Sequence, residues 1–426
     1  MIKTTVVGSY PVPTWLRALS SRESLRDAML AVLKTQELTG IDVVADGELY
    51  RWDINHAETN GMIDYFVRPM QGIHTELTFD QLHAWRIKSG TAFRASPPGI
   101  VVEAIAAGHL NLKADYDLYS DLSPLPKKFT VTSPYMLAKT LADQHYGDLP
   151  ALVQALADVL RQQVEVIDAD VVQIDEAHVT GHAEEADICA AGINRVLSGV
   201  SGERAVHLCY GNYGGQTIQD GTYEKLVKFL NGLHADHLVL EIARRPAAEL
   251  ALLKDVKESL GLRIGVIDIK DNEVESHEEV ESHEEVARRI EHAADQLGAS
   301  RIQYVHPDCG FWILPRSVAD AKMRALVAGR DLFAGRTQVR SHNSCDAPRE
   351  ARYRHCGGGV SWSFQSSPTR TSVHCCGPNS SPVDDISNIT STVAVSPLAL
   401  TLLARAFGIY CLMALRVASS GTAPSA

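Results

Sequence analysis

The residues best suited to chemistry are His207 and Cys209, which lie two positions apart in the short apolar run AVHLCY. In an extended strand alternate side chains point to the same side, so this imidazole and this thiol face one point. Glu241 and Cys309 lie at the ends of two other short apolar runs, HLVLEI and YVHPDCG. Zinc prefers nitrogen and sulfur ligands in a tetrahedral arrangement. We therefore predict a Zn²⁺ site formed by His207, Cys209, Glu241 and Cys309.

The charge of this ligand set indicates which reaction the site would support. Two thiolates and one carboxylate would give the site a net charge of about −1, which makes the metal a poor Lewis acid for water. Such a site can instead bind an incoming thiol and lower its pKa from about 8.5, so that a thiolate exists at neutral pH. The carboxylate is the hardest ligand, and Glu241 is therefore the ligand that we expect to be displaced. A lone cysteine is more often a small buried hydrophobic residue, but the pair HxC together with an independent DCG favours zinc.

Eight short apolar runs, each followed by a longer segment of helical spacing, must position these residues. They cover residues 4–9, 42–48, 128–133, 171–176, 204–209, 237–242, 263–269 and 301–309. Eight such units are typical of an α/β protein with a (β/α)8 TIM barrel, a fold of about 250 residues or more. The long gap after residue 48 predicts an insertion after the second strand. A doubly wound open sheet is the alternative, but no GxGxxG follows the first run.

In a barrel the carboxyl ends of all strands meet on one face, where active sites are built. The polar residues at the ends of the runs are Ser9, Glu48, Ser133, Asp175, Glu176, His207, Cys209, Glu241, Asp268 and Cys309. Glu48 and Asp175 could act as an acid-base pair or bind the ammonium group of an amino acid. A glycosidase-like hydrolase would use both carboxylates but would leave the cysteines without a role. Ser9, which follows Gly8, is either a turn residue or a donor to a carboxylate.

Composition and charge exclude several classes of function. The 426 residues are 45% hydrophobic, and the formal net charge is −12 without a basic stripe, so we expect no nucleic-acid partner. The N-terminus lacks the features of a signal peptide, which predicts a cytoplasmic protein. In so large a chain the cysteines are expected to be reduced thiols. Residues 398–417 have the length of a membrane span, but Arg405 and Arg416 interrupt them, and we expect no membrane anchor.

The composition changes abruptly after about residue 335, which divides the chain into two predicted parts. Residues 1–335 form the zinc-containing catalytic barrel, and residues 336–426 form a Ser-, Cys- and Arg-rich tail of low order. The tail is a disordered extension, a small added domain or a reading-frame artefact, and its HCCG segment resembles a metal knuckle only superficially. The tandem VESHEE at 274–279 and 280–285 is a duplication that lengthens a loop or a helix start. Its His277 and His283 are explained by a solvated, Glu-rich segment rather than by a metal site.

Seven motifs then point to one family. They are TVVGSYP, DVVADGExxRxD, QIDE, HLCY, LEIAR, GVIDI and HPDCG, in that order, over roughly residues 3–333. With them the chain resembles the catalytic barrel of cobalamin-independent methionine synthase, without that enzyme's N-terminal barrel. The resemblance implies that His207, Cys209, Glu241 and Cys309 bind catalytic zinc. It also implies that Ser9, Glu48 and Asp175 hold the amino-acid part of homocysteine, whose zinc-bound thiolate takes a methyl group to form methionine.

Two departures from the family concern the methyl donor. The chain begins directly at the catalytic barrel, and Lys270 stands where the family has a histidine that is thought to pass a proton. We therefore place Lys270 with Asp268 and Glu241 among the catalytic residues. The donor is expected to be a methylated folate or a methylated corrinoid, free or on a corrinoid protein. Two further hypotheses are the alkylation of another thiol, such as coenzyme M by an epoxyalkane, and a barrel without catalytic activity.

Overall fold

The computed structural model describes residues 2–52, 61–88, 96–212, 217–270, 282–335, 361–367 and 370–376. The chain divides into two units, Met1–Val339 and Arg340–Ala426.

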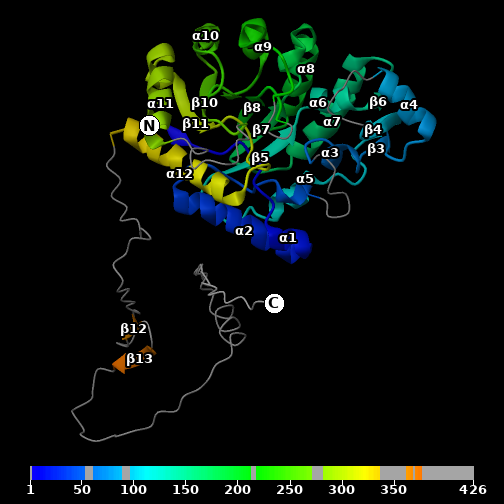
Figure 1. Cartoon of the computed structure of the whole chain (residues 1–426). Coiled ribbons are helices and arrows are strands. Elements are labelled where there is room, and N and C mark those ends of the chain that lie inside the picture. Colours follow the sequence, from blue (N-terminus) through cyan, green and yellow to red (C-terminus); the bar gives the residue numbers. More distant parts are fainter. Residues whose placement is uncertain are drawn as a thin grey trace, which may run out of the picture. The chain divides into compact units, whose positions relative to one another are not determined.

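The first unit is built on an eight-stranded sheet in the order β1-β11-β10-β9-β8-β7-β5-β2, in which every neighbouring pair is parallel. The strands are β1 (Lys3–Thr4), β2 (Val44–Ala45), β5 (Lys127–Thr132), β7 (Val171–Glu176), β8 (Glu203–Leu208), β9 (His237–Leu240), β10 (Gly261–Ile267) and β11 (Ile302–Pro307). Two isolated parallel bridges, Thr5 with Val43 and Ser9 with Gly47, join the first strand to the second and close the ring. Each predicted apolar run contributes one strand, and the prediction of a (β/α)8 barrel is confirmed (Figure 1).

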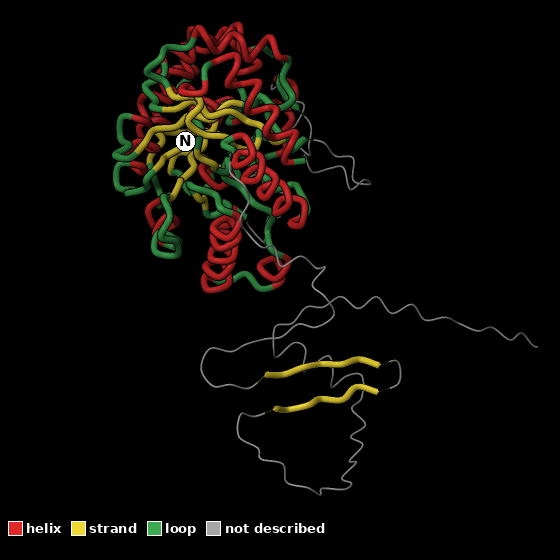
Figure 2. The backbone as a smooth tube through the Cα atoms, turned by 90° about the vertical axis from the view of Figure 1, so that its left-hand side faces the viewer, coloured by secondary structure: helices red, strands yellow, loops and turns green. Residues whose placement is uncertain are grey.

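Helices surround the strands of the barrel (Figure 2). The longer ones are α2 (Arg22–Thr39), α7 (Leu149–Val164), α8 (Ala186–Leu197), α11 (His283–Leu297) and α12 (Arg316–Phe333). Shorter ones are α1 (Thr14–Ala18), α6 (Pro134–Thr140), α9 (Val227–Gly232) and α10 (Ala247–Leu252), with the 3-10 turns η1 (Leu49–Arg51), η2 (Val179–Gly181), η3 (Ala183–Glu185), η4 (Tyr223–Leu226), η5 (Leu253–Asp255) and η6 (Ala299–Arg301). Side-chain caps begin several of them, because Ser21, Asp148 and Ser282 each accept a hydrogen bond from the amide three residues later.

The barrel interior changes from apolar to polar along the strands. At the amino ends the buried cluster Val43, Val171, Ala205, Val239 and Tyr304 fills the barrel. Two residues further along β7, the Nε2 group of Gln173 donates to the Asp175 carboxylate at 2.7 Å, and the buried Lys128 donates to Gln173 at 2.9 Å. Strand periodicity places Val171, Gln173 and Asp175 on the same face. The polar layer therefore leads from the packed core to the carboxyl ends, where the site lies.

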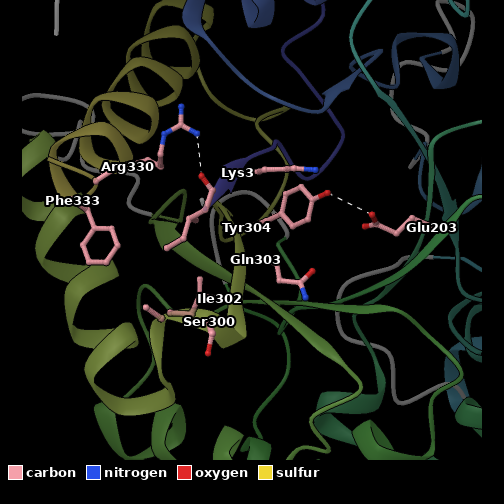
Figure 3. Close-up of a pocket in the computed structure, with 11 residues that line it drawn as sticks. Lys3, Glu203, Ser300, Ile302, Gln303, Tyr304, Arg330 and Phe333 are labelled. Atoms are coloured by element: carbon pink, nitrogen blue, oxygen red, sulfur yellow. Dashed lines mark hydrogen bonds between the residues drawn. The ribbon is translucent and has the colours of Figure 1, made fainter. Parts of the chain in front are cut away.

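The opposite end of the barrel carries a cavity of about 600 Å³ (Figure 3). Lys3, Glu203 and Tyr304, which lie at or near the first residues of their strands, are among the residues that line it. Beside it the fully buried Arg263 forms an ion pair with Glu203 and stacks its guanidinium 3.9 Å above the Tyr304 ring centre. This cavity is thus separated from the carboxyl ends of the strands by the barrel interior.

The insertion after the second strand has its own secondary structure. It contains α3 (Asp64–Val67), β3 (Gln71–His74), α4 (Phe79–Lys88), β4 (Ile100–Ala106) and α5 (Leu112–Asp117). Strands β3 and β4 are antiparallel, and β4 also pairs in parallel with β6 (Ala142–Asp143) to give a second, three-stranded sheet. Phe66 and Val67 are completely buried in the main hydrophobic cluster. The predicted insertion is therefore present, and it packs onto the barrel rather than forming a simple loop.

In the second unit the structure describes residues 361–367 and 370–376. Strands β12 (Ser361–Ser367) and β13 (Arg370–Cys376) form an antiparallel pair in which Ser361 lies opposite Cys376. The run 398–417 lies outside the described residues, as do Gly377 of the HCCG segment and residues 274–281 of the tandem, including His277. His283 is the first residue of α11 and is exposed, and its Nε2 atom lies 2.9 Å from Glu284 Oε1. None of the helices in the described ranges is both long and apolar enough to cross a membrane.

Candidate active site

Three of the four predicted zinc ligands meet at the carboxyl ends of the strands. His207 lies in β8, Cys209 directly follows β8, and Cys309 follows β11. One ring nitrogen of His207 and the Sγ atoms of both cysteines lie within 4.8 Å of one another. Cys209 and Cys309 are free thiols, the first buried and the second half-buried. The structure thus places these three residues next to one another at the ends of β8 and β11.

His207 is oriented as a metal ligand would be. Its Nδ1 atom lies 3.0 Å from the carbonyl oxygen of Val239, so we place the ring proton on Nδ1, from where it donates to that carbonyl. Its Nε2 atom is buried and has no hydrogen-bond partner within the described part of the chain. A histidine that ligates a metal commonly donates its other ring nitrogen to a backbone carbonyl in this way. The free lone pair of Nε2 fits a metal ion bound together with the two thiols.

Protons compete with a metal for this cluster. The contact with Cys309, together with burial, raises the pKa of Cys209 well above its usual value. Burial disfavours a charged imidazole, but the neighbouring Cys209 and Asp175 outweigh this effect and raise the pKa of His207. Because metal ligands must be deprotonated, a divalent cation would displace these protons on binding. The donor set is therefore chemically suited to zinc.

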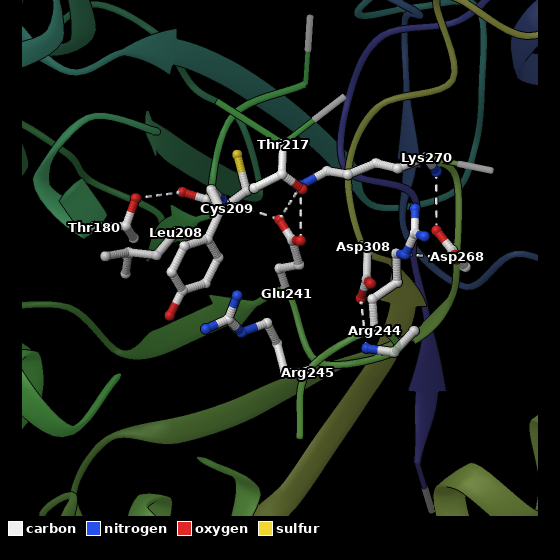
Figure 4. Close-up of polar contacts among 12 residues, drawn as sticks. Thr180, Leu208, Cys209, Thr217, Glu241, Arg244, Arg245, Asp268, Lys270 and Asp308 are labelled. Carbon is white, nitrogen blue, oxygen red and sulfur yellow. Dashed lines mark hydrogen bonds and ion pairs between the residues drawn. The ribbon is translucent and has the colours of Figure 1, made fainter. Parts of the chain in front are cut away.

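Glu241, the fourth predicted ligand, lies beside the cluster and is bound to a lysine. It does not belong to the three-residue group found among the described residues. Its two carboxylate oxygens lie 2.7 and 2.6 Å from the Lys270 Nζ atom, and both side chains are buried (Figure 4). Oε2 also accepts the backbone amide of Tyr210, the residue after Cys209, at 3.0 Å. The carboxylate is thus adjacent to the thiols but is held by a cation.

Lys270 is itself fixed by the loop after β10. Its backbone amide donates to Asp268 Oδ1 at 2.9 Å, and Asp268 Oδ2 forms an ion pair with Arg244 at 3.2 Å. Burial by itself would lower the pKa of Lys270, but its interactions with Cys209 and Glu241 more than offset this effect, so the pKa is raised. The lysine is therefore an ammonium that faces both the carboxylate and the thiols. The predicted catalytic residues Glu241, Asp268 and Lys270 form one connected group.

Asp308, which precedes Cys309, was not among the predicted site residues, although it lies in the HPDCG motif. Its Oδ1 atom accepts the backbone amides of Ile242 and Ala243, each at 3.0 Å, and its own amide donates to Ile267 at 2.8 Å. Burial and then the charge of Glu241 raise the pKa of Asp308 to about 7. A Cβ atom on Gly265 would lie 2.0 Å from Asp308 Oδ1, so only glycine fits there. Asp308 therefore joins the ends of β9, β10 and β11 around the cluster.

Glu48 follows β2 and is held in an unusual conformation. Its φ of 57° is the one positive value at a non-glycine residue among those described. The carboxylate accepts the Thr130 hydroxyl at 2.7 Å and pairs with the buried Arg51 at 3.1 Å. A Cβ atom on Gly8 would lie 2.1 Å from Glu48 Oε1. The carboxylate is thus pressed against the backbone next to Ser9.

Asp175 connects this carboxylate region to the cluster. It is the direct partner of His207 in the parallel ladder between β7 and β8. Burial and then the charge of Glu48 raise the pKa of Asp175 to about 6. On the other side, the Ser9 hydroxyl lies so close to Gly310 that a Cβ atom there would come within 2.0 Å of it. The structure therefore brings Ser9, Glu48 and Asp175 to the same face as the cysteines.

The remaining strand-end residues have structural roles. The Ser133 hydroxyl accepts the Tyr135 amide at 3.2 Å and caps α6, and Glu176 accepts the amides of His178 and Val179 at 2.6 and 2.9 Å. Arg51, the arginine of the DVVADGExxRxD motif, was not predicted as a site residue, although its spacing three residues after Glu48 is typical of an ion pair. The network of Lys128 and Gln173 was not predicted either, because a strand of alternating residues rarely carries buried polar groups.

Comparison with known proteins places the chain in a family. The sequence profile described as "Cobalamin-independent synthase, Catalytic domain" matches residues 2–330. The chain is similar to the methionine synthase of Thermococcus kodakarensis, with 27% identity over 353 residues that cover 78% of this chain and 93% of that protein. It is 26% identical over 360 residues to the methionine synthase of Sulfurisphaera tokodaii, covering 81% and 96%.

Among solved structures, the fold is similar to that of a B12-independent methionine synthase from Shewanella sp. in complex with selenomethionine. The TM-score is 0.64 at 23% sequence identity, and the match covers 79% of this chain and 98% of the other. Because the family profile spans most of the sequence, the chain belongs to the family of cobalamin-independent synthase catalytic domains.

Proposed function

We propose that the chain is a zinc-dependent methyltransferase that methylates the thiol of homocysteine to form methionine. Its family and the names of its relatives support a methyltransferase that makes methionine. The single observation that carries the zinc proposal is the cluster of His207, Cys209 and Cys309, with an unpartnered Nε2 atom among the described residues. We further propose that this chemistry takes place in the cytoplasm.

His207, Cys209 and Cys309 would hold the metal, with Glu241 as the fourth ligand. Bound zinc would lower the pKa of an incoming thiol, so that a thiolate is available near neutral pH. The half-buried Cys309 marks the side of the cluster that a substrate can reach. Glu241 already has other partners, which is consistent with a ligand that gives way to a thiol.

Ser9, Glu48 and Asp175 would hold the amino-acid part of the substrate. Glu48 and Asp175 lie close enough for the charge of one to raise the pKa of the other, and both are buried. An ammonium group between them would relieve this repulsion and make charge-assisted hydrogen bonds. Ser9 would offer its amide and hydroxyl to the substrate carboxylate. The amino-acid ends would then lie beside His207, with the thiol directed to the cluster.

The transfer itself is a displacement at the methyl carbon. A bond forms between the substrate sulfur and the methyl carbon, and the bond between that carbon and the donor breaks with its electron pair staying on the donor. The thiol proton goes to solvent, and a folate donor takes up one proton on the nitrogen that loses the methyl group, whereas a corrinoid keeps the pair on its cobalt. We propose a methylated folate or a methylated corrinoid as the donor, free or on a corrinoid protein. Asp268 fixes the backbone of Lys270, and Lys270 balances the charge of Glu241 during this step.

The double substitution Glu48→Gln and Asp175→Asn tests the amino-acid acceptor. Without the two negative charges, homocysteine should bind at least about tenfold more weakly, since a charge-assisted bond contributes about 1.5–3 kcal/mol. Glu258→Gln, at an exposed position before β10, is the matched control and should change nothing. Isothermal titration with homocysteine measures the affinity. Unchanged affinity in the double variant would favour the second candidate, alkylation of a thiol without an amino group, such as coenzyme M.

A barrel without catalytic activity makes a different prediction. In that case a chelator would remove no metal and would not lower the thermal stability of the purified chain. The proposed enzyme should instead contain about one zinc per chain and should lose stability when a chelator removes it, because metal binding contributes folding free energy.

A further inference from the structure

The ion pair between Lys270 and Glu241 suggests how the site exchanges a protein ligand for a substrate. We propose that Lys270 is a positioning residue that binds the Glu241 carboxylate away from the metal and so keeps the fourth ligand position open to the thiol. This inference rests on the proposed function, because it assigns a role to Lys270 in thiol binding at the same site.

The contacts of Glu241 show how completely the carboxylate is engaged. Both oxygens lie within 2.7 Å of the Lys270 Nζ atom, and Oε2 also accepts the Tyr210 amide. The Lys270 side chain is 0% exposed and that of Glu241 is 2% exposed. A buried, charge-assisted pair is strong because little water competes with it. Glu241 can therefore leave the metal without becoming an unpaired buried charge.

The position of the pair favours exchange over a purely structural role. The amide that donates to Glu241 belongs to Tyr210, the residue directly after Cys209, so the carboxylate lies next to the strand end that carries a proposed ligand. Lys270 is anchored from the other side, because Asp268 binds its amide and Lys322 donates to the Asp268 carbonyl at 2.7 Å. Figure 4 shows Glu241 between Cys209 and Lys270. With zinc bound, the carboxylate would have the metal and Lys270 as alternative cationic partners, and Lys270 is the one held in place by its own contacts.

The total charge explains why a lysine is useful here. Zinc with two cysteine thiolates is neutral, and Glu241 with Lys270 forms a second neutral pair. Adding a substrate thiolate then leaves the buried site with a net charge of about −1, whereas without Lys270 the same site would carry about −2. Lys270 therefore lowers the electrostatic cost of binding an anionic thiol. In this role Lys270 acts through Glu241.

The substitution Lys270→Met tests this role. Glu241 then has the metal as its remaining cationic partner, so it should bind the metal more persistently. Zinc should be lost to a chromogenic chelator more slowly than from the wild-type chain, by about tenfold, and homocysteine should bind about tenfold more weakly. Cobalt-substituted protein gives a readout that is independent of turnover, because each thiolate ligand adds a charge-transfer absorption. The homocysteine concentration that produces the added band should rise by the same factor.

Two further variants separate exchange from general loss of structure. Lys270→Met combined with Glu241→Gln removes the competing carboxylate and should return the homocysteine titration to near the wild-type midpoint. Lys139→Met breaks another Lys–Glu pair, with Glu185 at 2.9 Å, and should leave both the zinc loss rate and the titration unchanged. Circular dichroism of each variant checks the fold.

The inference is overturned if Lys270→Met matches the wild type in both measurements, or if it loses zinc faster, as a merely structural pair predicts. A wild-type chain that binds zinc and methylates homocysteine while Lys270→Met behaves identically would remove only this inference. A wild-type chain that binds no zinc would overturn the proposed function and this inference together.

Discussion

At the scale of single residues, the site is made of ionisable groups that are buried in pairs. Glu48 lies against Arg51, Glu241 against Lys270, and His207 against Cys209. Pairing allows charges to remain buried, since removing one partner leaves the other without compensation. The pKa values of Asp175, Cys209, Lys270 and Asp308 are all raised, and these four residues lie at the carboxyl ends of the strands. Such clustering is typical of functional sites.

Asp46 gives a pH-dependent prediction at this scale. Burial, together with the charge of Glu48, raises the pKa of Asp46 to about 7. This is above the unfolded value of about 4, so the protonated carboxyl stabilises the fold at low pH, and this contribution is lost as the pH rises from about 4 through 7. In the wild type the backbone amide of Glu48 donates to Asp46 Oδ1 at 2.6 Å, and the side-chain oxygen of Asp46→Asn keeps this acceptor. The substitution should remove roughly 2–4 kcal/mol of the pH dependence of the stability.

The measurement is the thermal midpoint of both proteins between pH 4 and pH 8. The wild type should lose stability relative to Asp46→Asn as the pH rises. Two parallel curves would contradict the assignment of a raised pKa to Asp46.

At the scale of secondary-structure elements, strand ends hold the cluster in place. Asp308 joins β9, β10 and β11 by accepting two amides and donating one. This close approach depends on Gly265, where a Cβ atom would lie 2.0 Å from Asp308 Oδ1 and 2.9 Å from the Leu240 carbonyl. The position of Glu241 and Cys309 therefore depends on a glycine in the strand between them.

Gly265→Ala should accordingly lower the free energy of unfolding by about 1–3 kcal/mol, as overpacking does. It should also speed the loss of zinc, because Asp308 would move together with Cys309. Gly232→Ala is the control, since a Cβ atom there meets nothing within 4 Å. If Gly265→Ala equals Gly232→Ala in chelator competition and in thermal stability, the joining role of Asp308 is wrong.

The sequence predicted much at this scale. Alternation in AVHLCY placed His207 and Cys209 on one side, and barrel topology brought Cys309 to them. The Lys270–Glu241 pair could not be predicted in this way, because Lys270 lies beyond the end of β10, where strand periodicity no longer determines the direction of a side chain. The three-stranded sheet that joins β3 and β4 of the insertion to β6 was also not predicted, since strands as short as β6 carry little periodic signal.

At the scale of the whole molecule, the described site lies entirely within the first unit. All the predicted site residues fall between Ser9 and Cys309, and α12 is the last helix described in the first unit. The two compact units of the chain divide between residues 339 and 340. That the catalytic barrel ends near residue 335 remains a prediction. We propose that residues 336–426 are dispensable for metal binding and methyl transfer.

A chain that ends at Gly335 tests this proposal. It should keep the zinc content and the methyl-transfer rate of the full chain within about twofold, because all the proposed ligands belong to the first unit. Metal analysis and the same activity assay on both chains provide the comparison. Loss of zinc from a truncated chain that remains folded would show that the tail contributes to the site.

The most direct test of the whole account is the zinc content and methionine production of the purified chain and of Cys209→Ser and Cys309→Ser. Assays with homocysteine would use methylcobalamin and a methylated folate in parallel. The account predicts about one zinc per wild-type chain, methionine from at least one donor, and loss of both zinc and activity in each variant. Stoichiometric zinc and full turnover in both variants would contradict it.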